Sequence, residues 1–314
     1  MTDTRETNAK VNLLRSLSGD LSSYLTKYEL VDLSLVSNIH LFNGLNNLKY
    51  KRFIPSIIEA KKYNIFDIIR NFKDDNLSEN KKEISKFINN MTTLNIVDLE
   101  GITPLFRAIM ADNLEIINMF ISAGDICDMN FKCENDHSDN DCPLHEAVYN
   151  NKIEIALALI NAGADINACG VQNFTPLQTA LIIFPDFEDI TLLTKLLELG
   201  ADPNITEIDG NTALNTIAIH GKGEHDNRIA CLNTIIEKTL DINLSNEEGN
   251  TPVHSAIING NLTIIKSLID AGACINIKNN RGDTALNTAM ESGNDQIIGY
   301  ISTIKQNILC NLCN

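Results

Sequence analysis

The sequence predicts an all-α protein in which a small N-terminal helical module precedes a solenoid of helix–turn–helix units joined by β-hairpin loops. Two observations lead to this fold class. A short motif of the form Thr-Pro-Leu-His recurs through the 314 residues, at intervals of 39, 33, 37, 39 and 33 residues. The first fifty residues lack the motif but carry leucines at helical spacing.

The recurring motif has the chemistry of a helix start. A Thr side chain caps the first turn, and a Pro at the first helical position gives up no needed hydrogen bond. The six copies begin at Thr103, Cys142, Thr175, Thr212, Thr251 and Thr284. A second helix with apolar spacing follows, as in Ile153 to Ile160. Gly163 then ends that helix, and Asp165 and Asn167 predict a hairpin turn before the next copy.

A period of about 33 residues with this motif resembles that of the ankyrin repeat. The resemblance covers residues 98–304 and implies six stacked copies, the last one a cap, because one copy cannot bury its apolar face alone. Residues 51–97 are interpreted as a helical linker with a degenerate repeat or an N-terminal cap, and residues 305–314 as a C-terminal tail. In the family the His place of the motif ties neighbouring turns together, which implies structural roles for His145 and His254.

The N-terminal module carries a second resemblance. Leucines recur at a spacing of four residues from Leu13 to Leu25 and form one stripe of a helix. Tyr24-Leu25, Glu29-Leu30 and the segment Leu33 to Ser37 then follow in order. Over about residues 11–50 this pattern resembles the F-box. The sequence departs from the family at Leu14, where Pro is usual.

The F-box resemblance implies a partner for residues 1–50, the Skp-type linker of a cullin ubiquitin ligase. The residues expected to contact this linker are Leu13, Leu17, Leu21, Leu25, Leu30, Leu33, Leu35 and Val36. In the alternative interpretation, the same module is an amphipathic helical cap of the repeat stack.

The ankyrin resemblance also implies a second surface, on the concave face of the repeats. The apolar residues expected there are Tyr149, Val171, Phe174, Ile182, Ile183, Ile208, Ile219 and Ile258. A row of exposed apolar residues indicates protein binding, although some of these side chains fit equally well between repeats. Tyr149 and Phe174 are the preferred anchors, because binding hot spots favour aromatic residues.

Charge is distributed unevenly along the chain. Residues 1–97 hold 14 Lys and Arg against 11 Asp and Glu, a net of +3, and the remainder holds 11 against 30, a net of −19. An acidic repeat region repels a phosphate backbone, so nucleic acid is not an expected partner. The sequence predicts neither a membrane span nor a secretory signal, and we therefore expect a cytoplasmic protein with reduced cysteines.

Candidate chemistry is sparse. No phosphate-binding, metalloprotease or serine-hydrolase motif occurs, so neither an enzyme nor a cofactor is expected. Three cysteines and two histidines gather in one stretch, but their spacing fits no familiar zinc site, and we expect no metal there. The residues concerned are Cys127, Cys133, His137, Cys142 and His145. Cys310 and Cys313 form an isolated pair at the end of the sequence, for which no metal is expected either.

These observations favour an adaptor whose N-terminal module recruits a cullin ligase and whose repeats hold an unknown target protein. If a pathogen makes the protein, it acts as an effector in the host cytoplasm. The alternative is a plain ankyrin-repeat interaction scaffold with a helical cap, and an enzyme is a third, disfavoured interpretation.

Overall fold

A computed structural model describes residues 65–70, 77–98, 101–133, 141–183, 190–221 and 226–312. The chain divides into two compact units, Met1–Glu59 and Ala60–Asn314. All described residues belong to the second unit, so the predicted F-box-like module lies outside them.

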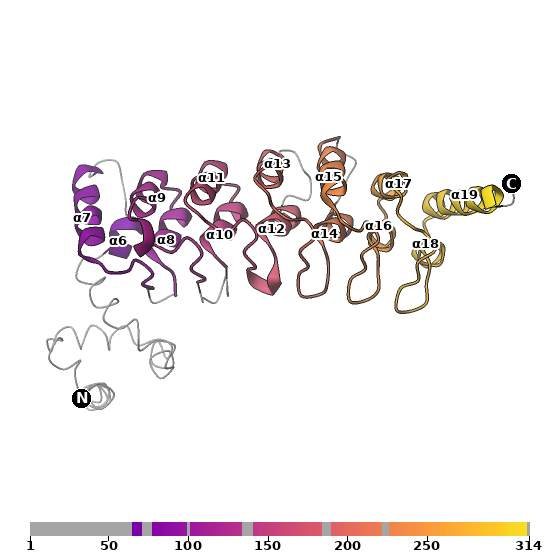
Figure 1. The fold of residues 1–314 in the computed structure, drawn as a ribbon, viewed down its shortest axis with the longest axis horizontal. Coiled ribbons are helices and arrows are strands. Elements are labelled where there is room, and N and C mark those ends of the chain that lie inside the picture. Colours follow the sequence, from indigo (N-terminus) through magenta and orange to yellow (C-terminus); the bar gives the residue numbers. More distant parts are fainter. Residues whose placement is uncertain are drawn as a thin grey trace, which may run out of the picture. The chain divides into compact units, whose positions relative to one another are not determined.

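The described residues confirm the all-α fold class, because they contain helices and no regular strands. The helices alternate along the chain between a row of first helices and a row of second helices (Figure 1). The first helices are α6 (Ile65–Arg70), α8 (Pro104–Met110), α10 (Pro143–Tyr149), α12 (Pro176–Ile183), α14 (Ala213–His220), α16 (Pro252–Asn259) and α18 (Ala285–Ser292). The second helices are α7 (Leu77–Asn90), α9 (Leu114–Ile121), α11 (Ile153–Asn161), α13 (Thr191–Glu198), α15 (Asp226–Lys238), α17 (Leu262–Asp270) and α19 (Asp295–Leu312).

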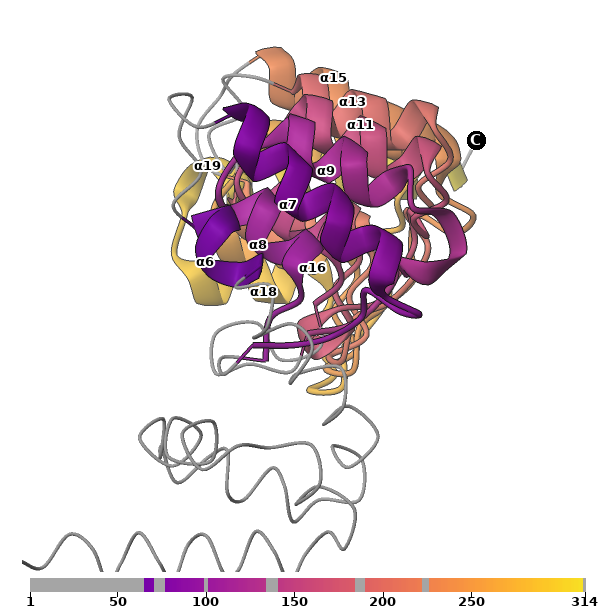
Figure 2. The same cartoon turned by 90° about the vertical axis from the view of Figure 1, so that its left-hand side faces the viewer.

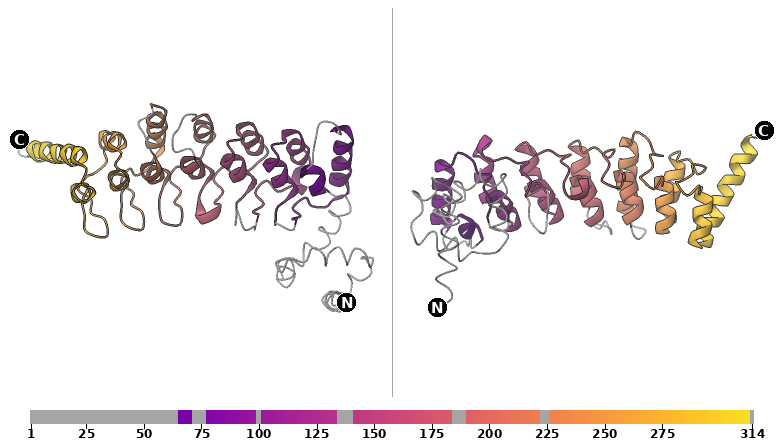
Figure 3. Two further views of the ribbon diagram at one scale, coloured as in Figure 1. Left: turned by 180° about the vertical axis from the view of Figure 1, so that it is seen from behind. Right: turned by 90° about the horizontal axis from the view of Figure 1, so that it is seen from below.

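Stacking within this unit follows the chain order. Each first helix packs against its own second helix and against the first helix of the next pair. A view along the stack shows the second helices α7, α9 and α11 on one side and the first helices α6 and α8 on the other (Figure 2). The loops that join consecutive pairs all project from the side of the first helices (Figure 3). Two short 3₁₀ turns, η3 (Gly124–Ile126) and η4 (Val171–Asn173), lie in these loops.

The motif starts its helices as the sequence predicts. The Thr103 hydroxyl oxygen accepts a hydrogen bond from the Phe106 N–H at 3.2 Å, and Pro104 occupies the first turn of α8. Thr212 caps α14 in the same way. Capping of this kind typically stabilises a helix by about 1 kcal/mol, so the motif fixes where each first helix begins.

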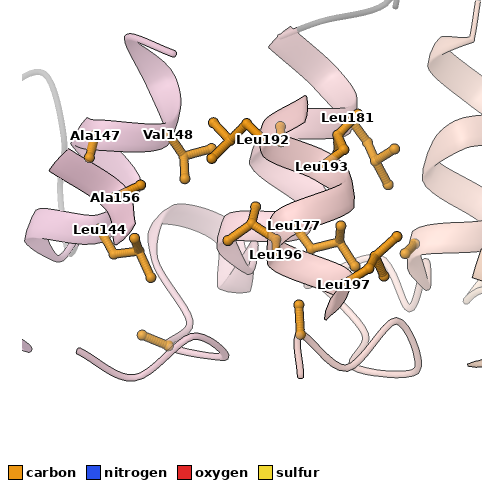
Figure 4. Close-up of a cluster of buried hydrophobic side chains, with 14 of the residues drawn as sticks. Leu144, Ala147, Val148, Ala156, Leu177, Leu181, Leu192, Leu193, Leu196 and Leu197 are labelled. Atoms are coloured by element: carbon orange, nitrogen blue, oxygen red, sulfur yellow. The ribbon is translucent and has the colours of Figure 1, made fainter. Parts of the chain in front are cut away.

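One continuous apolar core runs between the two rows of helices. Leucines of α12 and α13 share this core with Leu144 and Val148 of α10, and small alanines such as Ala147 and Ala156 let neighbouring helices approach closely (Figure 4). The same core extends through Phe120 of α9 to Phe87 of α7. Because each helix pair buries its apolar face only against its neighbours, stability is shared between adjacent pairs.

Both ends of the array differ in detail from the sequence interpretation. Helix α6 contacts α8 in the row of first helices and pairs with α7, so residues 65–90 supply a further helix pair before the first motif. Residues 51–64, the first part of the predicted linker with a degenerate repeat or cap, lie outside the described residues. At the other end α19 continues to Leu312, past residue 304. Among the described residues, no helix has the length and apolar character of a membrane span.

Candidate protein-binding surface

The loops between helix pairs are held at fixed spacing by a ladder of asparagines. Each side-chain carbonyl oxygen accepts a hydrogen bond from a backbone N–H of the next loop, at 2.7 to 2.9 Å. The asparagines are Asn95, Asn130, Asn167, Asn204 and Asn243. Such bonds satisfy backbone groups that no sheet pairs, and they make the loops a rigid frame.

The loop tips are joined directly by their backbones. The Ile208 N–H donates to the Gln172 carbonyl at 2.9 Å, and the Glu247 N–H donates to the Asp209 carbonyl at 2.9 Å. On the next tip, the Asn280 N–H donates to the Glu248 carbonyl at 3.0 Å. In the part of the chain that the structure describes, single backbone hydrogen bonds therefore join neighbouring tips. The isolated bridge between Cys133 and Asp141 lies within one loop, and no regular hairpin strand forms in these described residues.

The fourth residue of the motif links each helix start to the next loop. His145 Nε2 lies 2.9 Å from the Phe174 carbonyl oxygen, and His254 Nε2 lies 3.1 Å from that of Asp283. Gln178 makes the same kind of link, donating to the Asn211 carbonyl at 2.8 Å. These contacts confirm the structural roles expected for His145 and His254.

The pKa values of the two buried histidines are shifted in opposite directions. Burial lowers the pKa of His254, and the Asp283 carbonyl only partly offsets this effect. Burial also opposes the charged form of His145, but the Cys142 thiol, with its sulfur 3.0 Å from Nδ1, outweighs it and raises the pKa of His145. Burial opposes ionisation of the Cys142 thiol as well, yet His145 lowers the pKa of this thiol.

Acid is therefore expected to destabilise the array through His254. Its folded pKa lies below the unfolded value of about 6.5, so the unfolded chain takes up a proton that the folded chain does not. The stability that neutral His254 contributes is therefore fully present above about pH 6.5, and it is lost as the pH falls from that value toward the lower pKa of the folded state. We expect His254→Gln to lose less unfolding free energy than the wild type between about pH 7.5 and pH 5.5 in urea titrations.

The Gln substitution is matched to the fold, because Gln178 already makes this link elsewhere in the array. The control is His145→Gln, which removes a group with a raised pKa and should not reduce the loss in acid. Identical pH dependence in the wild type and His254→Gln would contradict the assignment.

The eight residues predicted for the concave face all keep accessible surface. Tyr149, Ile208 and Ile258 are exposed by 61%, 55% and 57%. The remaining five, which are half-buried, are Val171, Phe174, Ile182, Ile183 and Ile219. None of the eight belongs to the fully buried core.

The structure separates these residues into two groups. Five lie at the ends of first helices, namely Tyr149, Ile182, Ile183, Ile219 and Ile258. The other three lie on loops, Val171 and Phe174 at η4 and Ile208 at the next tip. The predicted surface therefore has a helical part and a loop part.

The helical part has a strict register. An apolar residue stands seven positions after the start of the motif in five consecutive copies. We call these residues the apolar row: Met110, Tyr149, Ile182, Ile219 and Ile258. Met110 is 50% exposed and was not among the residues predicted from sequence. Its position, seven residues after Thr103, matches that of the other members of the row and could have identified it. In the sixth copy the position is held by Glu291.

The loop part carries negative charge. Asp209, Glu247 and Glu248 are exposed on two consecutive tips, and we call them the acidic tips. On the helix side, burial raises the pKa of Glu146, which lies half-buried in α10. The sixth copy shows that a tip side chain can reach the row position, because Arg281 on its tip lies 3.2 Å from Glu291.

Two cysteines of the cysteine and histidine stretch, Cys127 and Cys133, are held as neutral thiols. Burial raises the pKa of Cys127 to about 12 and that of Cys133 to about 11. Among the described residues, no three or more potential ligands lie close enough together to hold a metal ion. His137 and Cys313 lie outside those residues, and Cys310 lies in α19.

The residues predicted to contact the ligase linker also lie outside the described part of the chain. They are Leu13, Leu17, Leu21, Leu25, Leu30, Leu33, Leu35 and Val36. Their role stays a prediction from sequence.

Comparison with known proteins gives relatives that share part of the array. The chain is 32% identical over 124 residues to alpha-latroinsectotoxin-Lt1a of Latrodectus tredecimguttatus, covering 39% of the chain and 8% of the toxin. It is 28% identical to human transient receptor potential cation channel subfamily A member 1, covering 58% of the chain and 16% of the channel. It is also 28% identical to the phosphocholine transferase AnkX of Legionella pneumophila, covering 40% of the chain and 13% of that protein.

The chain spans about a quarter or less of the length of these and similar curated relatives. A family model described as ankyrin repeats in three copies matches residues 76–169 and 224–311, more than half of the sequence. With the stacked helix pairs and the linked loops, this match shows that the chain belongs to the ankyrin-repeat family.

Proposed function

We propose that the protein is a non-catalytic interaction scaffold that holds a partner protein against the apolar row and the adjacent loop tips. The observation that carries this proposal is the register of the row. An apolar side chain recurs at one helix position in five consecutive repeats, and Met110, Tyr149 and Ile258 are each at least half exposed. A contiguous exposed apolar surface favours association with another protein.

The frame beneath this surface supports the same function. The asparagine ladder and the links from the motif hold consecutive repeats at constant spacing. A preorganised surface loses little conformational freedom on binding, which favours affinity. A scaffold needs such rigidity and no catalytic group.

Proximity labelling in cells tests this proposal, with the labelling enzyme fused to the full chain. We expect a set of labelled proteins that is lost in the double variant Tyr149→Ala/Ile258→Glu. The matched control is Leu240→Glu, which changes an 88% exposed leucine outside the row. If the double variant and the wild type label the same proteins, the row is not the binding surface.

A finer proposal concerns residues 1–50, and it rests on the F-box resemblance of the sequence alone. In this proposal the N-terminal module binds the Skp-type linker of a cullin ligase, and the repeats bring a target close to it. Linking two binding modules raises the effective concentration of one partner near the other. If the chain acts in a host cell, the ligase belongs to the host.

Purified linker and full-length chain test the adaptor proposal. We expect binding by the wild type and none by Leu25→Ala/Leu30→Ala, because loss of two apolar contacts removes more energy than a small module can spare. The helical signal of the repeats should remain unchanged in the variant. Failure of the wild-type chain to bind the linker would leave the scaffold without the adaptor function.

A further inference from the structure

The spacing of the apolar row restricts what can bind along it. Packed helices lie about 8–10 Å apart, so consecutive members of the row are separated by about that distance. A partner that contacts each repeat in turn must therefore present an apolar side chain on the same face about every 10 Å.

An α-helix meets this requirement and an extended strand does not. Seven residues of a helix advance about 10 Å and return the side chain to nearly the same face. Three residues of a strand also advance about 10 Å, but alternate side chains point to opposite faces. Polyproline II segments have suitable spacing as well, although they dock in grooves lined by aromatic residues. The row has one aromatic residue, Tyr149, and is otherwise Met and Ile, the surface that suits an amphipathic helix.

The charge beside the row restricts the partner further. Two consecutive loop tips expose Asp209, Glu247 and Glu248. The equivalent tip position in the following repeat holds Arg281, which pairs with Glu291 and Asp283. Complementary charge across an interface steers association and fixes register, so positive charge is expected on the partner opposite the acidic tips.

We infer that the partner segment is a basic amphipathic helix, whose apolar residues recur every seven positions along the row and whose Lys and Arg side chains face the acidic tips. This inference rests on the proposed scaffold function and names the chemistry of the partner. The helix lies along the array, with its positive charge concentrated near the repeats of α14 and α16, because the loops that precede these two helices carry the acidic tips.

A displayed library of random peptides, each about 30 residues and thus about four heptads long, provides the test against the full-length chain. We expect the enriched peptides to carry net positive charge, apolar residues at heptad spacing, and helical structure by circular dichroism when bound. Tyr149→Ala should weaken their binding about thirtyfold, the loss typical of a hot-spot residue. Leu240→Glu should leave it unchanged.

Charge reversal tests the acidic tips separately. Asp209→Lys/Glu247→Lys should weaken binding about tenfold, because like charges then face each other. The tips are bonded through the Asp209 carbonyl and the Glu247 N–H, so the variant keeps the groups that join them. A peptide in which Glu replaces the Lys residues that face the tips should bind this variant with restored affinity. Urea titration confirms that each variant is folded.

The possible results separate the inference from the proposed function. Enriched peptides that depend on Tyr149 but are acidic, proline-rich or without heptad spacing overturn the inference and leave the surface in place. Peptides that bind Tyr149→Ala and Ile258→Glu as well as the wild type overturn both. A selection that enriches no peptide against the wild-type chain also counts against both.

Discussion

Replacing Leu196 with alanine is expected to lower the free energy of unfolding of the repeat array by about 2–5 kcal/mol. Leu196 is fully buried in α13, in the core cluster that also holds Leu177 and Leu181 of α12 (Figure 4). The substitution removes apolar contacts and leaves a cavity that a closely packed interior only partly fills. Because repeats couple mainly to their neighbours, the damage should be greatest around α13.

Urea unfolding followed by far-ultraviolet circular dichroism measures this effect. The control is Leu199→Ala, at the end of the same helix, where the side chain is 45% exposed. We expect the control to change stability by no more than about 0.5 kcal/mol. Similar losses for the two variants would mean that Leu196 is not part of a tightly packed core.

The second large effect is expected at Gly249, on the loop tip before α16. Its φ is +76°, a conformation that side chains rarely adopt, and an added Cβ would lie 2.6 Å from the Asn280 backbone nitrogen. That nitrogen donates to the Glu248 carbonyl and joins two tips. Gly249→Ala should therefore cost both left-handed strain of about 1–2 kcal/mol and a further 1–3 kcal/mol, roughly, from the clash.

Gly282→Ala is the matched control, because Gly282 occupies the same place on the next tip. Its φ is +87°, but nothing lies within 4 Å of an added Cβ. The control should show the backbone strain alone. At a constant urea slope, the difference between the midpoints of the two variants then measures the free-energy cost of the clash with Asn280. Equal destabilisation would show that the tips are not closely joined at Asn280.

Several features of the site were predictable from sequence because they depend on short-range chemistry. Thr103 and Pro104 start a helix through groups three or fewer residues away. The recurrence of the motif predicted the stack, and all eight residues placed on its binding face lie on helix ends or loops. Met110 had the same position in the motif and required only a stricter comparison of the copies.

Other features depended on groups that are distant in the sequence. The Asn130 side chain accepts from the Asp165 N–H, 35 residues later, and the acceptor could equally have faced water in an isolated repeat. Helix α6 has only six residues, and its apolar spacing alone does not show whether it is a first or a second helix of a pair. Its place follows from contact with α8 and α7.

The sequence by itself determined the repeat, the helix starts and the apolar identity of the row, because each depends on residues only a few positions apart within one copy of the motif. Only the tertiary structure decided which of those apolar residues remain exposed and which charges lie beside them. It also paired Arg107 with Asp98, whose Nε and Oδ2 atoms lie 2.7 Å apart with both side chains about one-tenth exposed. Exposure and charge pairing depend on what packs against a side chain, and in a stacked array the neighbour comes from the next repeat.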